Sequence, residues 1–369
     1  MIINSQSVLT IWHDEPDGPV FIIDQTRLPE RFEIAELNHL GDAVAAIAHM
    51  QVRGAPLIGA TAAYGLALAC RRDASDPALK RAGEALLSAR PTAINLAWAV
   101  ERVSQNLASV PVSERASAAL RLAQAICEED IALCSAMGDH GVQLIRNIAN
   151  RPGRAPGPVN ILTHCNAGAL ATLDWGTATA PIYKARQAGI DVHVWVDETR
   201  PRNQGALTAW ELAAQDVPHT FVVDNAGGHL MQHGQVDLCL VGTDRTTASG
   251  DVCNKIGTYL KALAAHDNQV PFYVCAPSPS IDWSVDDGLK EIPIEQRDDA
   301  EVRQVFGRAE DGTGHWVSVV PEATATRNDA FDVTPARLVT GLITERGIAT
   351  ASRDGLATLF PDLAGKRAS

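Results

Sequence analysis

The chain has 369 residues, of which 46% are hydrophobic and 20% are charged, and its formal net charge is −13. This length exceeds what one hydrophobic core usually serves, so we expect a globular protein of two domains. The negative charge argues against a nucleic-acid partner, which requires a basic surface. It is compatible with an anionic small molecule bound in a locally basic pocket.

The seven cysteines are odd in number and form no Cys-x-x-Cys pair, which is typical of reduced thiols in a cytosolic protein. The first residues lack the basic and apolar regions of a signal peptide. No apolar run reaches the ~18 residues that cross a membrane. We therefore expect a cytoplasmic protein without a membrane partner.

Residues 1–150 are predicted to form a mostly helical N-terminal domain that begins with a β-hairpin. Residues 8–13 and 20–23 are short β-like runs on either side of Glu15-Pro16-Asp17-Gly18, a strong turn signal. From about Glu33 onward, Ala and Leu recur with a spacing near 3.6 residues, which predicts helices up to Asn150.

Residues 151–158, which are dense in Pro, Gly and Arg, are predicted to be the linker to a second domain at 159–369. In this second part, helical segments such as 206–215 and 254–267 alternate with apolar strand candidates. The strand candidates are residues 159–164, 191–196, 219–223, 236–242, 271–276 and 316–320. Their apolar runs are continuous, which predicts an α/β fold with a Rossmann-like, doubly wound parallel sheet.

Polar or glycine-rich segments follow five consecutive strand candidates. They are residues 164–169, 197–205, 224–229, 243–245 together with 250–255, and 277–280. In an open parallel sheet, ligands bind in the crevice beyond the carboxyl ends of the strands. The five segments together therefore indicate an active site at this edge.

Cys165 and Asp244 are the candidate acid–base groups. A free cysteine is more often a small buried filler, but Cys165 follows a strand and is expected at the start of a helix, which would lower the pKa of its thiol. Asp244 either caps a helix or, if desolvated, serves as an acid with a raised pKa. The functional interpretation predicts pKa shifts in opposite directions.

Arg53, Gly54 and Ala55 precede a helix that begins near Leu57. Free backbone N–H groups, close approach at the glycine and a fixed positive charge make this segment a candidate phosphate cradle. Arg90 is a second candidate anion ligand, and Gly227-Gly228 could be another backbone approach to a ligand. The P-loop, dinucleotide-binding and HExxH zinc patterns are absent from the sequence.

Long segments of the chain resemble the methylthioribose-1-phosphate isomerase family. The matching segments are residues 53–65, 90–99, 161–172, 197–206, 207–212, 224–231, 242–265 and 330–347. The resemblance implies an intramolecular oxidoreductase that converts S-methyl-5-thioribose 1-phosphate to S-methyl-5-thioribulose 1-phosphate in methionine salvage. It also implies a homodimer that needs neither a metal nor an organic cofactor.

The resemblance also implies roles for individual residues. Cys165 and Asp244 match the family's catalytic pair. The matches to its substrate-binding positions are Arg53, Gly54, Ala55, Arg90, Gln204, Asn254 and Lys255. The chain has one residue fewer than the family motif just after Ala206, which could shift the side chain of Gln204.

Several alternatives remain open from the sequence. Hydrogen could move between C1 and C2 by proton transfer or by hydride shift. A related sugar, such as ribose 1,5-bisphosphate or 5-deoxyribose 1-phosphate, could be the substrate. The same fold also forms regulatory subunits of a translation-initiation exchange factor, which are binding proteins that lack the Cys and Asp pair.

Overall fold

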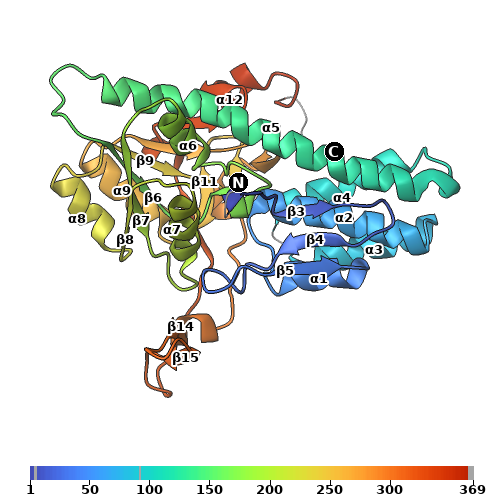
Figure 1. The fold of residues 1–369 in the computed structure, drawn as a ribbon. Coiled ribbons are helices and arrows are strands. Elements are labelled where there is room, and N and C mark those ends of the chain that lie inside the picture. Colours follow the sequence, from blue (N-terminus) through green and yellow to red (C-terminus); the bar gives the residue numbers. More distant parts are fainter. Residues whose placement is uncertain (4–5, 91–92, 365–369) are drawn as a thin grey trace.

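The computed structural model describes residues 1–3, 6–90 and 93–364 (Figure 1). The chain begins with β1 (Ile2–Ile3) and β2 (Gln6–Ser7), followed by a three-stranded antiparallel sheet of β3 (Ile11–His13), β4 (Val20–Ile23) and β5 (Ile34–Leu37). The pairing of β3 with β4 confirms the predicted hairpin. The prediction of a helix from about Glu33 was wrong for β5, because pairing with the apolar strand β4 overrides the local helical pattern.

Five helices pack together after this sheet. They are α1 (Leu40–Ala48), α2 (Ala55–Arg72), α3 (Asp76–Ala89), α4 (Ile94–Leu107) and α5 (Arg115–Ala149). The first begins in a capping box, in which the His39 side chain accepts the Asp42 N–H and the Asp42 carboxylate accepts the His39 N–H. The Ala-rich helix α2 contacts the other four and is buried along most of its length. Its small side chains allow this central position.

Helix α5 is 35 residues long and contributes side chains to two hydrophobic cores. Its buried residues up to Cys127 pack with α2, whereas those from Cys134 onward pack with the large sheet and α6. Figure 1 shows α5 running across both halves of the molecule. Residues 151–158 follow α5 without regular secondary structure. The domain boundary at residue 150 remains a prediction.

The large sheet has seven strands in the order β18-β17-β12-β9-β6-β7-β8. Their bounds are β6 (Val159–Thr163), β7 (Val192–Asp197), β8 (His219–Val222), β9 (Leu238–Val241), β12 (Phe272–Cys275), β17 (Gly341–Thr344) and β18 (Gly347–Ala349). All neighbours are parallel except β17 and β18. Five of the six predicted strands are thereby confirmed as members of a largely parallel sheet.

Helices cover both faces of this sheet. The other helices are α6 (Ala180–Gln187), α7 (Gln204–Ala214), α8 (Ala226–Gln232), α9 (Thr258–Asp267), α10 (Gly288–Glu291), α11 (Ala300–Arg303) and α12 (Arg353–Leu359). Side chains of α5, α6 and α7 join one core, and those of α8, α9 and α12 join the core on the opposite face. The predicted α/β fold with a doubly wound sheet is confirmed. No helix within the described ranges is long and apolar enough to span a membrane.

A second sheet was not predicted. It contains β13 (Ile281–Asp282), β10 (Arg245–Thr247), β11 (Val252–Lys255) and β16 (Phe331–Thr334). The predicted helix at 254–267 was wrong for Asn254 and Lys255, because both residues pair with β16 and α9 begins only at Thr258.

The strand predicted at 316–320 lies outside the main sheet. It overlaps β15 (Gly314–Ser318), which pairs only with β14 (Gln304–Arg308) among the described strands. Figure 1 shows this hairpin projecting from the body of the molecule.

Candidate active site

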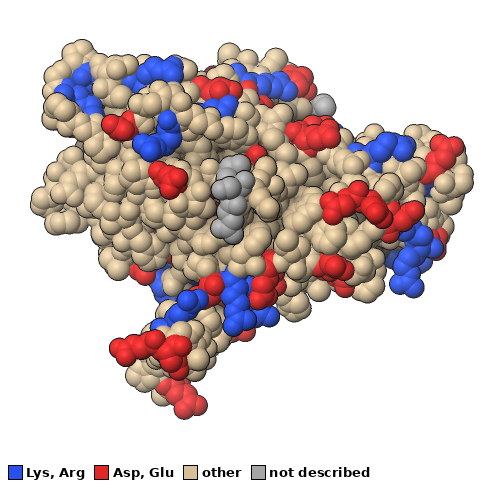
Figure 2. Space-filling view, in the orientation of Figure 1, with Lys and Arg blue, Asp and Glu red and all other residues tan. Residues whose placement is uncertain are grey.

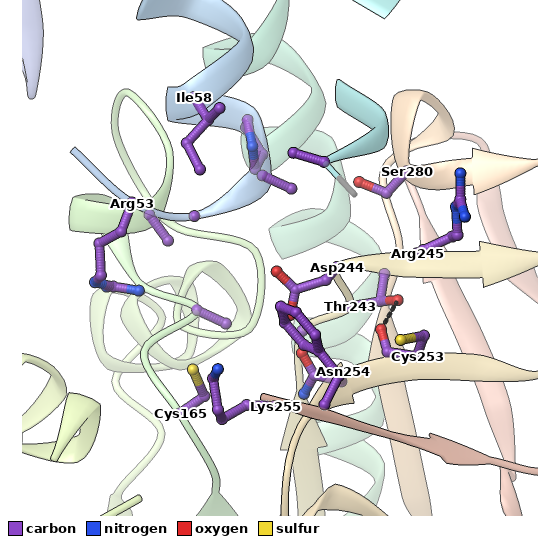
Figure 3. A pocket seen from close by; sticks show the side chains of 18 of the residues that line it. Arg53, Ile58, Cys165, Thr243, Asp244, Arg245, Cys253, Asn254, Lys255 and Ser280 are labelled. Carbon is purple, nitrogen blue, oxygen red and sulfur yellow. Dashed lines mark hydrogen bonds between the residues drawn. The ribbon is translucent and has the colours of Figure 1, made fainter. Parts of the chain in front are cut away.

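One cavity collects all nine residues predicted for the site. Helix α2 and its preceding turn form one wall, and the carboxyl ends of the large sheet form another. The nine residues are Arg53, Gly54, Ala55, Arg90, Cys165, Gln204, Asp244, Asn254 and Lys255. In Figure 3, Cys165, Asp244 and Lys255 point into the same cavity.

The cavity lies where the strand order reverses. In chain order, the strands from β8 to β12 across the sheet are 3-2-1-4-5, so the reversal falls between β6 and β9. Segments following β6, β7, β9 and β12 line the cavity, as predicted. The fifth predicted segment does not line it. Gly227 lies in α8 and faces the side chains of Leu162 in β6 and Lys261 in α9, so the Gly227-Gly228 pair is no part of this cavity.

Cys165 follows β6 but does not start a helix. Its backbone has a positive φ of 69°, and the next regular element is a short 3-10 turn at Ala169–Ala171. Two hydrogen bonds hold its backbone: its N–H donates to Thr199 Oγ1 at 2.9 Å, and its carbonyl accepts from Thr208 Oγ1 at 2.9 Å. The expectation of a helix N-terminus was therefore wrong, and the side chains of Thr199, which follows β7, and Thr208 in α7 hold the backbone of Cys165 instead.

Cys165 lies in the wall of the cavity, and the protein packed around its thiol removes water from it and so raises its pKa. The positive charges of Arg53 and Lys255 lower the pKa, but burial has the larger effect. The predicted lowering of the thiol pKa was wrong because there is no helix terminus at this position and because two cations do not offset the loss of water. Cys165 is the only half-buried cysteine of the seven, and all seven are free thiols.

Asp244 follows β9 and leads directly into β10, so it caps no helix. Its backbone N–H donates to the Cys253 carbonyl at 3.1 Å. Burial raises the pKa of the carboxyl group, against the opposing charges of Lys255 and Arg90. The predicted rise of this pKa is confirmed. The prediction of opposite shifts was wrong, because burial moves the pKa of both acid groups upward.

The phosphate cradle predicted at Arg53 to Ala55 forms the turn into α2. Gly54 is the residue before the helix and has a φ of 89°; a side chain there would collide with Ala171. The buried Arg53 guanidinium donates to the Asn166 carbonyl at 3.2 Å and to the Asn166 side chain. Arg53 is therefore fixed beside Cys165 as well as beside the helix start.

Two further cations face the cavity. A guanidinium nitrogen of Arg90 lies 3.4 Å from the Glu295 carboxylate. Lys255 Nζ donates to the Ala330 carbonyl at 2.8 Å and lies 4.4 Å from the centre of the Phe331 ring. With Arg53, these side chains give the cavity a positive lining in a protein of negative net charge.

Figure 2 shows acidic and basic residues interspersed over one outer face of the molecule.

Gln204 and Asn254 supply neutral polar groups. Gln204 is the first residue of α7 and lines the cavity despite the shortened motif after Ala206. Its side-chain carbonyl oxygen is buried and has no hydrogen-bond partner among the described residues. Asn254 donates to Thr258 Oγ1 at 3.0 Å. Such groups can bind the hydroxyls of a small ligand.

The apolar part of the lining was missed by the sequence analysis. It includes Met50, Ile58, Ala93, Ile292, Pro293 and Phe331. Ile58, Ala93 and Phe331 lie in segments that match the family, but their residue types gave no sign of a role, and Met50, Ile292 and Pro293 lie outside those segments. Only their convergence in the fold identifies this wall. An apolar wall excludes water and thereby strengthens electrostatic interactions in the cavity.

A cluster of ionisable groups lies behind Cys165. Potential ligand atoms of His164, Asp197 and Asp224 are all within 4.8 Å of one another, which is compact enough for a metal ion. However, Lys261 Nζ already lies 3.3 Å from the Asp197 carboxylate. Lys261 thus places a cationic side chain beside these carboxylates, and we treat the group as an ion-pair cluster.

A thiol, a buried carboxyl group and three cationic side chains at a sheet reversal define an α/β enzyme site for an anionic small molecule. Comparisons with known proteins are specific. Residues 51–351 match the Initiation factor 2 subunit family. A methylthioribose-1-phosphate isomerase from Rhodospirillum rubrum is 62% identical over 359 residues, which cover 96% of this chain and 92% of the relative.

Two solved structures are also similar. The 5-methylthioribose 1-phosphate isomerase of Pyrococcus horikoshii has a TM-score of 0.82 and 35% identity, with 97% of each chain covered. A structure named translation initiation factor eIF-2B subunit delta, from A. fulgidus, has a TM-score of 0.78 and 36% identity, covering 96% of this chain and 100% of that one. The chain belongs to the Initiation factor 2 subunit family and, within it, to the methylthioribose-1-phosphate isomerases.

Proposed function

We infer that this protein is an aldose–ketose isomerase that converts S-methyl-5-thioribose 1-phosphate to S-methyl-5-thioribulose 1-phosphate, a step of methionine salvage. The observation that carries the inference is the 62% identity, over nearly the whole chain, to a relative named for this activity. The cavity supports it, because its lining combines protonatable groups, cations and an apolar wall.

The substrate phosphate is proposed to bind at the start of α2, where Gly54 and Ala55 offer backbone N–H groups and Arg53 adds positive charge. Arg90 and Lys255 contribute further positive charge from other walls of the cavity. The unpartnered oxygen of Gln204 and the amide of Asn254 are proposed to bind sugar hydroxyls. The methylthio group would then face the apolar residues.

The proposed acid is Asp244, whose raised pKa keeps a proton available for the ring oxygen as the ring opens. Cys165 is proposed to exchange a proton with a substrate hydroxyl. Burial raises the pKa of both groups above their ordinary values, so each holds its proton to a higher pH than it would in water. A thiol that keeps its proton is a poor base for a C–H bond, so we propose a hydride shift from C2 to C1 rather than proton transfer through an enolate-like intermediate.

A binding role like that of an exchange-factor subunit is the alternative from another class. The 36% identity to the A. fulgidus structure is the observation that favours this binding role. The higher identities of 62% and 61% to relatives named isomerase favour the enzyme. We also propose a cytoplasmic homodimer; light scattering after gel filtration would test the dimer.

The decisive experiment gives the purified protein C2-deuterated S-methyl-5-thioribose 1-phosphate in ordinary water. Formation of the ketose phosphate tests the activity, and deuterium retained at C1 indicates hydride shift. Loss of the label to water would contradict the hydride route. Parallel assays with 5-deoxyribose 1-phosphate and ribose 1,5-bisphosphate test the substrate, since a second phosphate is poorly accommodated by an apolar wall. Absence of turnover with all three sugars would refute the proposed activity.

A further inference from the structure

His164 is buried immediately behind Cys165 and lies between two hydrogen-bond acceptors. Its Nδ1 is 3.0 Å from Asp197 Oδ2, and its Nε2 is 2.8 Å from the backbone carbonyl oxygen of Ile256. A carbonyl oxygen only accepts, and an ionised carboxylate only accepts. Lys261 Nζ, 3.3 Å from the same carboxylate oxygen, supports the ionised form of Asp197. Both ring nitrogens must then carry hydrogen, which makes the ring an imidazolium.

The charged groups around this ring come from four elements and suit a cation. Asp197 ends β7, and Asp224, which follows β8, has a carboxylate oxygen 3.9 Å from Nδ1. Asp332 in β16 interacts electrostatically with His164, and Lys261 of α9 is the other cation. Three carboxylates thus face two cations, and the ring is almost completely buried.

The backbone turn after β11 leaves room for the His164 ring because it contains a glycine. Gly257 has a φ of 104°, a conformation that favours glycine. A Cβ atom at this position would lie 2.9 Å from Cε1 and 3.0 Å from Nε2 of His164. The Gly257 N–H donates to the Asp332 carboxylate at 2.7 Å, which fixes the turn. The close approach of turn and ring is therefore built into the backbone.

The hydrogen bond from His164 joins the two sheets at the active site. His164 follows β6 of the large sheet and precedes Cys165, whereas Ile256 follows β11 of the second sheet and is adjacent to Lys255. We propose that His164 is a positioning residue which, as an imidazolium, holds the Cys165 thiol at a fixed place relative to Lys255. The kinetic part of this proposal rests on the proposed isomerase function.

The proposal has a consequence for the thiol that does not depend on turnover. The charge of Lys255 lowers the pKa of Cys165, in opposition to burial. If the tie between the two sheets is cut, Lys255 and the thiol are free to separate. The pKa of the thiol should then rise further, and alkylation should require a higher pH.

The test variants are His164→Gln and His164→Asn. Their side chains donate hydrogen bonds only from one amide NH2 group and cannot replace the two ring N–H groups of the imidazolium. His193→Gln is the matched control, because His193 lies on the neighbouring strand β7 and hydrogen-bonds Thr220 instead. We expect both His164 variants to lower kcat about tenfold or more with KM changed less than about threefold, as for loss of positioning. The control should keep wild-type kinetics.

Iodoacetamide alkylation of Cys165, followed by mass spectrometry against pH, separates the positioning role from the proposed function. The midpoint of this profile should rise by about half a pH unit or more in the His164 variants. A folded His164→Gln protein with wild-type kcat and an unchanged alkylation profile would overturn the proposal. If the profile shifts while no sugar phosphate turns over, the positioning role stands and the isomerase assignment fails.

One measurement on the wild-type protein remains informative if the variants do not fold. Histidine-selective ¹⁵N NMR should show two N–H protons on the His164 ring, with imidazolium nitrogen shifts at neutral pH, identified through contacts to Gly257. A single ring N–H, as in a neutral tautomer, would refute the imidazolium and with it the proposed double tie.

Discussion

Arg90, at the end of α3, and Glu295, between β13 and β14, form an ion pair of 3.4 Å beside the candidate active site. Glu295 also pairs with Arg297 at 2.9 Å, and its negative charge helps to raise the pKa of Asp244. The Glu295 carboxylate thus contacts Arg90, which is proposed to bind the substrate phosphate, and it also affects the pKa of Asp244, the proposed acid. In the proposed mechanism, phosphate binding at Arg90 and proton retention at Asp244 would therefore be linked through Glu295.

Glu295→Gln should move the alkaline limit of activity to lower pH. The proposed mechanism needs protonated Asp244, so activity falls as the pH rises through the pKa of this group. Removing the neighbouring negative charge should lower that pKa, because the charge of Glu295 is one of the influences that raise it. The measurement is kcat against pH, with Glu310→Gln on the exposed β14–β15 turn as the control. An unshifted alkaline limb would contradict the link.

Asp244→Asn should give a folded protein that binds substrate but turns it over about 10²–10⁴-fold more slowly, as expected for the loss of a general acid. No helix begins at this residue, so no capping interaction is lost. Turnover and calorimetric affinity for the substrate should be measured together. Wild-type turnover in this variant would show that Asp244 is not the acid.

Cys165→Ser should reduce turnover by about two orders of magnitude or more while leaving the melting temperature close to that of the wild type. A serine hydroxyl preserves size but is a much weaker acid than a thiol. Cys70→Ala is the control, because Cys70 is buried in α2 outside the cavity lining. If both variants kept full activity, Cys165 would have only a packing role.

Arg53→Ala should impair both binding and turnover. A charge-assisted contact to phosphate is worth roughly 1.5–3 kcal/mol, which corresponds to a tenfold or greater loss of affinity. Turnover should also fall, because Arg53 holds Asn166 next to the thiol. Arg53→Lys should recover part of the affinity but less of kcat, since an ammonium group lacks the fork geometry. Unchanged affinity in Arg53→Ala would place the phosphate elsewhere.

Asp130→Asn should stabilise the protein at alkaline pH more than at acidic pH. Burial in α5 raises the pKa of Asp130 to about 7, from an ordinary value of 3.8. Between these values the folded protein holds a proton that the unfolded chain has released, so this group's stabilising contribution falls as the pH rises toward 7 and is fully lost above it. The relative gain of the variant is on the order of 2–4 kcal/mol at pH 8.

Thermal unfolding at pH 5 and pH 8 measures this difference. The amide oxygen of the variant can still accept the Leu173 N–H, which donates to Asp130 at 3.1 Å. Asp267→Asn at the exposed end of α9 provides the control and should show little dependence on pH. Equal effects of Asp130→Asn at the two pH values would mean that Asp130 is ionised throughout this range.

The sequence was informative wherever local pattern and fold agree. Buried strands such as β9, with its continuous Leu238–Val241 run, are recognisable because both faces are covered. The convergence of Cys165 and Asp244 was predictable because the carboxyl ends of parallel strands meet at one edge. Long motifs then identified the same cavity independently, through Arg53 and Lys255.

What the sequence did not predict depends on distant partners. Asn254 and Lys255 are strand residues because β16, almost eighty residues later, pairs with them. The pKa of Cys165 depends on how completely the finished cavity excludes water, which no local pattern encodes. Glu295 and Ile292 reach the site through an irregular segment without a motif. Such features follow from tertiary packing.

The continuous helix α5 limits how far the two halves of the enzyme can move relative to each other. Its 35 residues correspond to about 52 Å of unbroken helix, and both ends are embedded in different cores. A hinge rotation of the two halves about residues 151–158 would have to bend α5, and the helix opposes this motion. We therefore expect the walls that carry Arg53 and Cys165 to keep their separation when substrate binds.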